Sequence, residues 1–232
     1  MSWGAVIVAA GSGQRFGQPK QLIDIAGKPM LAWSVETFAA MPEVSTLVVT
    51  TEAEFVPSVE TLVKRAASKL DTRVIVGGAE RQDSVRLALV ALSEGAGTGP
   101  QYAFIHDGAR PMIRIEDVRR GMAVVAPGVG ALLAIPVVDT IKQVNGSRKV
   151  TGTLDRAKLW AAQTPQFGML DDLLRVHRAA QTQGIRVTDD AALLEDAGLA
   201  VIVVEGNAEN FKVTVPADLA RAELILRERA AV

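Results

Sequence analysis

The stretch V-I-V-A-A-G-S-G-Q-R-F-G-Q-P-K-Q, residues 6–21, decides how this chain folds. An apolar run ends in small residues, as a buried strand does where it enters a turn. Gly11 and Gly13 allow a tight turn and leave backbone N–H groups accessible to an anion. Arg15 and Lys20 bring two cations into the same loop, and both suit phosphate oxygens. The stretch therefore predicts a strand followed by a phosphate-binding loop.

Two common glycine-rich loops do not match this stretch. A dinucleotide-binding fingerprint needs G-x-G-x-x-G, but Phe16 stands where the third glycine would be. A P-loop needs a glycine directly before its lysine, whereas Pro19 precedes Lys20. The glycine spacing thus argues against an NAD-dependent dehydrogenase. The remaining pattern, A-A-G-x-G-x-R followed by P-K, resembles the signature of sugar and polyol nucleotidyltransferases.

Length and composition place the chain among ordinary α/β proteins. Its 232 residues suffice for a single domain over residues 1–232, and 49% of them are hydrophobic. The net charge is −1, so no overall field attracts nucleic acid or an acidic membrane. The absence of cysteine excludes disulfides and thiol catalysis. We recognise neither a membrane span nor a signal peptide, and we expect a cytoplasmic protein without nucleic-acid or membrane partners.

Short apolar runs alternate with helical patterns along the chain. Predicted strands cover residues 5–9, 46–50, 73–76, 103–106, 130–137 and 200–205. Helical spacing begins with Leu31 and Val35 after Pro29, and recurs at residues 85–92 and 115–122. This alternation predicts a three-layer α/β/α sandwich with a doubly wound, mostly parallel sheet, which binds ligands at the carboxyl ends of its strands.

Residues 139–160 interrupt the alternation. Asn145-Gly146 is a strong hairpin signal between two β-prone segments. Such a hairpin has too few apolar residues to form a core of its own. We therefore expect a β-hairpin arm that projects from the sandwich and packs on a second subunit. A surface hairpin without a partner is the alternative.

Polar motifs follow the predicted strands. They are G-G-A-E-R-Q-D-S-V (77–85), H-D-G-A-R-P (106–111), P-V-V-D-T (136–140), D-R (155–156), Q-T-P-Q (163–166), T-D-D-A (188–191) and N-F-K-V-T (210–214). Each alone is a weak turn or cap motif. Together with the first loop, their order and spacing resemble the 2-C-methyl-D-erythritol 4-phosphate cytidylyltransferases from Val6 to about Leu224.

The resemblance implies cytidylyl transfer from CTP to the substrate phosphate with release of pyrophosphate, a step of non-mevalonate isoprenoid biosynthesis. Arg15 and Lys20 would stabilise the transition state. The nucleotide would be bound by Ala9, Ala10, Gly11, Gly13, Gly78, Ala79, Ser84 and Asp107. Small side chains and backbone N–H groups at these positions would admit a pyrimidine and exclude a purine.

Asp107 is the candidate metal ligand. A carboxylate at a strand end can hold Mg²⁺, or another divalent ion, against triphosphate oxygens. In the structural alternative Asp107 caps its turn or pairs with Arg110, and we expect Arg110 to hold Asp107 or a backbone carbonyl. His106 is expected to be structural, because a phosphate nucleophile is already ionised near neutral pH. His177 is expected to be a surface or satisfied helical residue.

The second substrate would, by the same resemblance, be positioned by Thr140, Arg156, Thr164, Thr188 and Lys212. Arg156 lies on the arm, so in a homodimer with exchanged arms it would serve either its own site or the partner subunit's site. Two other functions remain open, namely a cytidylyltransferase for ribitol 5-phosphate or another polyol phosphate, and a CTP-sensing protein without turnover. The presence of Arg15, Lys20 and Asp107 together argues against a degenerate site.

Overall fold

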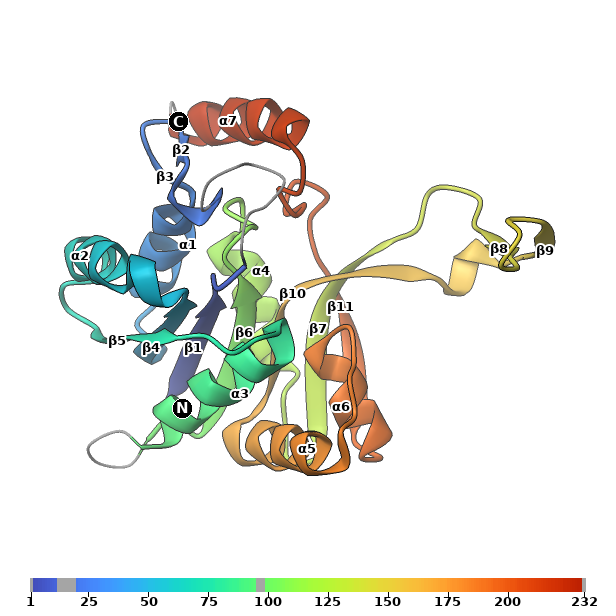
Figure 1. The fold of residues 1–232 in the computed structure, drawn as a ribbon, viewed down its shortest axis with the longest axis horizontal. Coiled ribbons are helices and arrows are strands. Elements are labelled where there is room, and N and C mark those ends of the chain that lie inside the picture. Colours follow the sequence, from blue (N-terminus) through green and yellow to red (C-terminus); the bar gives the residue numbers. More distant parts are fainter. Residues whose placement is uncertain (1, 12–19, 95–98, 231–232) are drawn as a thin grey trace.

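A seven-stranded sheet forms the centre of the computed structural model, which describes residues 2–11, 20–94 and 99–230 (Figure 1). In spatial order its strands are β11 (Ala200–Glu205), β7 (Val129–Pro136), β10 (Trp160–Met169), β6 (Tyr102–Asp107), β1 (Trp3–Val8), β4 (Val44–Thr51) and β5 (Asp71–Val76). Neighbouring strands are parallel except for β10, which is antiparallel to both β6 and β7. The predicted mostly parallel α/β fold is confirmed.

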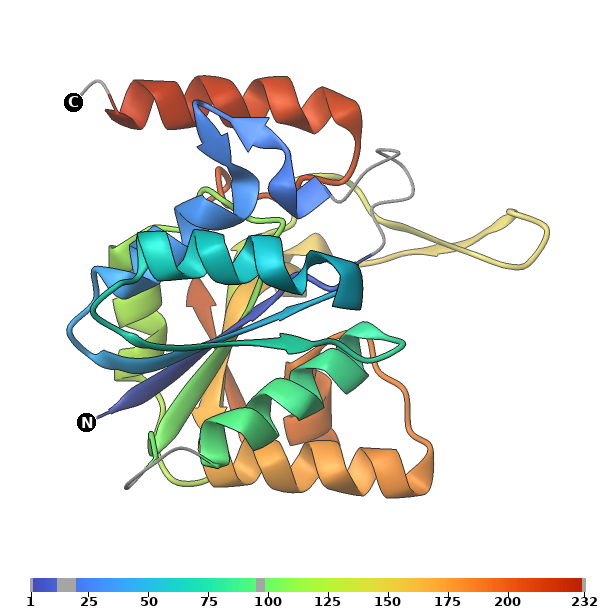
Figure 2. The ribbon, with the colours of Figure 1, turned by 60° about the vertical axis from the view of Figure 1, so that its left-hand side comes forward.

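Helices cover both faces of the sheet, as Figure 2 shows. One face carries α1 (Met30–Ala39), α2 (Val56–Ala66) and α4 (Ile115–Ala123). The opposite face carries α3 (Arg81–Ser93), α5 (Leu170–Gln183) and α6 (Asp190–Asp196). No helix within the described ranges is both long and apolar enough to cross a membrane.

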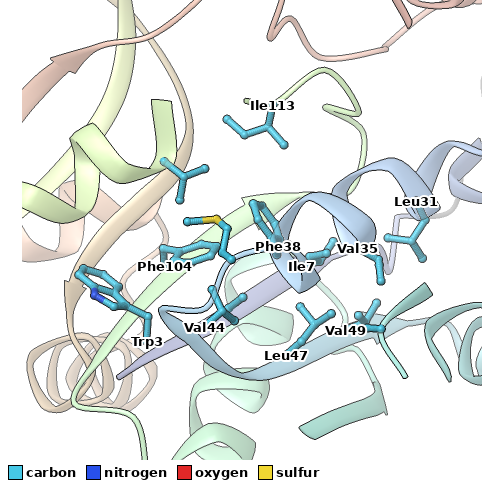
Figure 3. Packing of buried hydrophobic residues seen from close by; sticks show 14 of the residues in the cluster. Trp3, Ile7, Leu31, Val35, Phe38, Val44, Leu47, Val49, Phe104 and Ile113 are labelled. Carbon is cyan, nitrogen blue, oxygen red and sulfur yellow. The ribbon is translucent and has the colours of Figure 1, made fainter. Parts of the chain in front are cut away.

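The core follows from the alternation of side chains along the buried strands. In β1, Ala5 and Ile7 face the α1 layer, whereas Val6 faces the α3 layer, and all three are fully buried. On the α1 side, Phe38 packs edge-on against Phe104 with ring centroids 4.9 Å apart (Figure 3). Burial of both strand faces explains why β1 reads as a continuous apolar run.

Short elements complete the domain beside the sheet. The two-stranded sheet β2 (Asp24–Ile25) and β3 (Lys28–Pro29) packs under the C-terminal helix α7 (Pro216–Ala230). Ile25, Met30, Val213 and Leu226 form their shared apolar cluster. Three 3₁₀ segments occur within the described residues, η2 (Lys20–Leu22), η3 (Ala53–Phe55) and η4 (Arg156–Lys158).

The predicted arm is a hairpin that projects far from the sandwich (Figure 1). It contains the antiparallel strands β8 (Lys142–Val144) and β9 (Val150–Thr153). At its tip Asn145 Oδ1 accepts hydrogen bonds from the backbone N–H groups of Ser147 and Lys149, which fixes the turn. Val138, at the base of the arm, is 78% exposed. The arm therefore presents apolar surface that its own chain leaves uncovered.

The sequence patterns missed one strand of the central sheet, β10. Its sequence W-A-A-Q-T-P-Q-F-G-M contains Gln163, Thr164, Pro165 and Gln166, and so reads neither as an apolar run nor as a clean alternation. The pairing of β10 with β7 shifts register between Ala162 and Gln166, which accommodates a proline that cannot donate to the ladder. The other six strands lie within two residues of their predicted bounds.

Candidate active site

A cavity of about 490 Å³ opens at the carboxyl ends of β1 and β6, where the switch in strand order places ligand sites in this architecture. Its lining comes from the segment after β1, the start of α3, the end of β6 and Lys212 near the C-terminus. The lining residues include Ala9, Ala10, Gly11, Lys20, Gly78, Ala79, Arg81, Ser84, Asp107 and Lys212. Nine of the sixteen described lining residues were predicted from the sequence, and Arg81 is among the seven that were not.

Small residues form two opposing walls of this cavity. A Cβ on Gly77 would lie 2.3 Å from the Cβ of Ala10, so the two walls touch here only because residue 77 is glycine. Ser84 is buried behind the second wall. Its hydroxyl accepts a hydrogen bond from the Gly78 N–H at 3.0 Å and donates one to the Glu80 carbonyl at 3.1 Å. Ser84 thus fixes the shape of the loop that follows β5.

Asp107, at the end of β6, pairs with two cationic side chains of the cavity. Arg81 Nε donates to its Oδ1 at 2.9 Å, and Lys212 Nζ donates to its Oδ2 at 2.8 Å. Burial alone would raise the pKa of Asp107, but the Arg81 guanidinium and the Lys212 ammonium hold that pKa well below its usual range. The carboxylate therefore stays ionised at any pH at which the protein would be assayed.

A buried hydrogen-bond chain supports the loop that carries Asp107. The Asp107 backbone N–H donates to Thr164 Oγ1 at 3.0 Å, and that hydroxyl lies 3.1 Å from His106 Nδ1. His106 Nε2 lies 3.1 Å from the Arg110 carbonyl. These contacts are consistent with a neutral imidazole that accepts at Nδ1 and donates at Nε2. Burial, opposed by nearby Asp107, lowers the pKa of His106 to about 4, so the ring is neutral near pH 7. The predicted structural role of His106 is confirmed.

Arg110 ties this loop to the segment that carries Lys212. Its Nη1 donates to the Asn210 carbonyl at 2.8 Å, and its Nε lies 3.9 Å from Asp107 Oδ2. The expectation that Arg110 holds Asp107 or a backbone carbonyl is confirmed. Asn210 Nδ2 in turn donates to the Thr164 carbonyl at 2.9 Å. Three segments remote in sequence thus meet behind Asp107.

The first loop is described only at its two ends. Gly11 lines the cavity, and Lys20 Nζ reaches the Val213 carbonyl at 3.3 Å from the other side. Lys20 thus contacts the residue that follows Lys212, and both lysines line the cavity. The predicted residues Gly13 and Arg15 lie outside the described residues.

The other residues predicted to position the second substrate lie in three different parts of the structure. Thr164 is buried behind Asp107 with its hydroxyl in the chain just described. Thr188 precedes α6 and is absent from the described lining of the cavity. Thr140 and Arg156 lie on the arm, where Arg156 Nη1 donates to the Val138 carbonyl at 2.6 Å. The single chain therefore does not bring Thr140 or Arg156 to its own cavity.

Sequence reasoning missed a buried ionic cluster behind the cavity. Arg81 Nη1 lies 2.9 Å from Asp190 Oδ2, and His177 Nε2 lies 3.3 Å from Asp190 Oδ1. His177 is thus an interior residue with an acidic partner, rather than one at the surface. The sequence did contain one indication of this cluster. Arg81 begins α3, and a cation at a helix N-terminus is unfavourable unless nearby acids compensate its charge.

The donor set of the cavity fits a metal ion that is bound mainly by phosphates. Within the described residues no group of three or more His, Cys, Asp or Glu side chains could hold a metal by itself. Mg²⁺ commonly binds through one or two carboxylates together with substrate phosphates and water. Asp107 can supply one such oxygen if Lys212, whose side chain is 42% exposed, leaves Oδ2 for an incoming phosphate.

The chain is similar in sequence to proteins of one family over almost its whole length. The sequence model of the family described as 2-C-methyl-D-erythritol 4-phosphate cytidylyltransferase matches residues 4–228. A protein of that name from Synechococcus elongatus is 42% identical over 226 residues, which cover 97% of this chain and 96% of the relative. A bifunctional IspD/IspF enzyme of Rhodospirillum rubrum is 45% identical, and the match covers 96% of this chain but 56% of that enzyme.

Solved structures show the same fold. The enzyme structure from Thermus thermophilus, titled 2-C-methyl-D-erythritol 4-phosphate cytidylyltransferase, superposes with a TM-score of 0.78 at 28% identity, covering 98% of this chain and all of the other. A 4-diphosphocytidyl-2C-methyl-D-erythritol synthase from Anaerococcus prevotii gives a TM-score of 0.84 over 97% of this chain and 98% of the other, and at 22% identity it supports the fold alone. With the family match over nearly the whole sequence, this chain belongs to the 2-C-methyl-D-erythritol 4-phosphate cytidylyltransferase family.

Proposed function

We propose that the chain transfers the cytidylyl group of CTP to 2-C-methyl-D-erythritol 4-phosphate. A phosphate oxygen of the polyol attacks the α-phosphorus of CTP. As that P–O bond forms, the bond from the α-phosphorus to the bridging oxygen breaks and pyrophosphate leaves. The products are 4-diphosphocytidyl-2-C-methyl-D-erythritol and pyrophosphate. The observation that carries the proposal is the ionised Asp107 between Arg81 and Lys212, in a cavity with walls of small residues.

The wall formed by residues 77–84 would select the base. The Gly78 N–H already donates to Ser84, so what Gly78 can still offer a base is its carbonyl oxygen. A carbonyl acceptor suits the exocyclic amine of cytosine and leaves the O4 of uracil facing another acceptor. The close approach of Gly77 to Ala10 would leave too little width for a purine. These contacts support CTP as the nucleotide.

The cations around Asp107 would stabilise the reacting phosphates. Lys20 and Lys212 both reach the mouth of the cavity, and Arg15 belongs to the same loop as Lys20. A protein needs little covalent chemistry for this reaction, because positioning and charge neutralisation dominate phosphoryl-type transfer. Mg²⁺, when bound to the triphosphate and Asp107, would neutralise further charge on the phosphates. Lys212 would then move from Asp107 to the attacking phosphate.

The arm would complete the site of a second copy. Arg156 and Thr140 lie on a projection that leaves Val138, Val150 and Leu154 exposed. In a homodimer with exchanged arms these apolar side chains would be covered, and the cation of Arg156 would become available to a substrate phosphate. We therefore propose a homodimer as the functional unit.

Pyrophosphate release tests the proposed function. Each of CTP, UTP, ATP and GTP is combined with methylerythritol 4-phosphate, ribitol 5-phosphate or erythritol 4-phosphate in the presence of Mg²⁺. The proposal predicts turnover that requires both CTP and methylerythritol 4-phosphate. Preference for ribitol 5-phosphate would reassign the substrate, and CTP binding without release from any pair would indicate a sensor. Omission of the divalent ion, with chelator added, should abolish turnover.

A further inference from the structure

Arg81 contacts both Asp107, which lines the cavity, and Asp190, which is buried in the interior. Its Nε donates to Asp107 Oδ1 at 2.9 Å, and its Nη1 lies 2.9 Å from Asp190 Oδ2. The guanidinium is planar and rigid, and carboxylates beside two different nitrogens limit its movement. Arg81 therefore bridges Asp107 and Asp190.

Asp190 is buried more deeply than Asp107. It begins α6 and is 1% exposed, with His177 of α5 3.3 Å from its other oxygen. Gln166 of β10 accepts from the backbone N–H groups of Asp190 and Ala191, both at 2.8 Å, which fixes the start of α6 on the sheet. Burial alone would raise the pKa of Asp190, but Arg81 and His177 outweigh burial and keep it lowered. The second carboxylate is thus an ionised anchor built into the core.

The anchor has a specific use in the proposed reaction. Asp107 has to exchange Lys212 for phosphate-bound partners as substrates arrive, whereas Asp190 is out of reach of any ligand. Had Arg81 only Asp107 as a partner, it would lose its alignment whenever Asp107 moved. Asp190 gives Arg81 a second partner that stays in place.

We propose that Asp190, oriented by His177, is a positioning residue that keeps Arg81 aligned with Asp107 during nucleotide transfer. This inference rests on the proposed function for its kinetic consequence only. The alignment of Arg81 itself can be measured without turnover.

The kinetic test uses Asp190→Asn, which keeps the shape of the side chain and removes its charge. We expect kcat to fall by about 10- to 100-fold with a less than about threefold change in the KM for CTP, as small misplacements of catalytic groups produce. Asp196→Asn is the matched control. Asp196 is the exposed last residue of α6 and undergoes the same change of charge. The control should retain kcat within about twofold.

A double mutant separates positioning from general loss of structure. In an Asp107→Asn background, Asp190→Asn should cost little further kcat, because the carboxylate with which Asp190 aligns Arg81 is already absent. Additive losses would mean that Asp190 acts independently of Asp107. Unchanged kcat in the single Asp190→Asn variant, with only a lower melting temperature, would overturn the proposal in favour of a purely structural acid. If Asp190→Asn does not fold, His177→Gln takes its place, with the same predicted split between kcat and KM and the same opposing outcome.

The readout without turnover is the side-chain NMR signal of Arg81 Nε–H, assigned by its loss in Arg81→Lys. The anchored guanidinium should show slow hydrogen exchange in the free protein and in Asp196→Asn. Exchange should accelerate at least about tenfold in Asp190→Asn or His177→Gln, since one of two fixed partners is lost or loosened. Equal exchange in all variants would overturn the anchor. If the wild type shows no turnover with CTP and the polyol phosphate, the proposed function fails, and this measurement still decides the anchor.

Discussion

Lys212 Nζ lies 2.8 Å from Asp107 Oδ2, and the two residues are 105 positions apart in the chain. The contact brings the segment before α7 onto the end of β6, directly at the mouth of the cavity. Asp107 is 7% exposed, whereas the Lys212 side chain is 42% exposed. The carboxylate is therefore the more confined partner, and the exposed ammonium has room to move from Asp107 to a substrate phosphate.

Replacement of Lys212 by methionine removes this mobile charge and keeps most of the side-chain volume. We expect kcat to fall by about 10² to 10³, the usual cost of losing one charge contact to a transition state. The free energy of unfolding should fall by about 1–3 kcal/mol, because the buried Asp107 carboxylate loses one hydrogen-bonded cation and keeps Arg81. Lys64→Met, on exposed α2, is the control and should leave both quantities unchanged. A Lys212→Met variant with wild-type kcat would exclude this residue from the reaction.

Replacement of Gly77 by alanine tests the contact between the two walls of the cavity. The new Cβ would lie 2.3 Å from the Cβ of Ala10 and 2.8 Å from Ser84 Oγ, so the walls must move apart. We expect the KM for CTP to rise more than kcat falls, with a loss of about 1–3 kcal/mol in stability from overpacking. Gly146→Ala is the control, since a Cβ there meets nothing within 4 Å. Normal CTP affinity in Gly77→Ala would mean that this wall does not bind the nucleotide.

His106 should make the stability of the protein depend on pH. Burial lowers its pKa from 6.5 to about 4. Between these values the unfolded chain binds a proton that the folded chain does not, so stability is lost as pH falls from 6.5 towards 4. At 1.36 kcal/mol per pKa unit, the loss should amount to about 3 kcal/mol. Urea denaturation of wild type and His106→Gln across this range measures it.

The variant should show a flatter profile than the wild type over that interval. Asp107 contributes in the same sense but over a lower pH range, since its lowered pKa gives stability that is lost as pH falls below about 3.8. If His106→Gln does not fold, NMR titration of the wild type replaces it, because the chain has only two histidines to assign. An imidazole signal from His106 that titrates near 6.5 would contradict the buried neutral ring.

Mixing two inactive variants tests the exchanged arms. Arg156→Ala lies on the arm and Lys20→Ala lies beside the cavity. If Arg156 serves the partner's site, a mixed dimer contains one site with both lesions and one with neither. That species should regain up to about half of wild-type activity, whereas each homodimer stays inactive. Mixed dimers that form and remain inactive would place Arg156 in its own subunit's site.

Sequence reasoning recovered the parts of the fold that local patterns determine. Buried parallel strands read as apolar runs, and the Asn145-Gly146 turn fixes its hairpin through local hydrogen bonds. Strand β10 was not predicted, because its buried polar residues form hydrogen bonds with partners far away in the sequence. Thr164 bonds with residues of β6, and Gln166 bonds with the start of α6. No local pattern carries that information.

The candidate site likewise contains residues that local motifs predict and residues whose role depends on packing between distant elements. Lys212 and Asp107 belong to short motifs at the ends of predicted strands, and the structure brings them together. Arg81 stood inside a quoted motif, but its role depends on Asp190 and His177, which approach from two other helices. Such a cluster is defined by the packing of α3, α5 and α6, and its residue types alone do not distinguish it from ordinary helix ends.

The fate of the three phosphates of CTP tests the central claim most directly. The chain is incubated with methylerythritol 4-phosphate, Mg²⁺ and CTP labelled with ³²P at either the α or the γ position, and the products are separated by chromatography. Cytidylyl transfer predicts that the α label appears in the polyol product and the γ label appears in pyrophosphate, in equal amounts. Transfer of the γ label to the polyol, with release of CDP, would show a kinase and contradict the account.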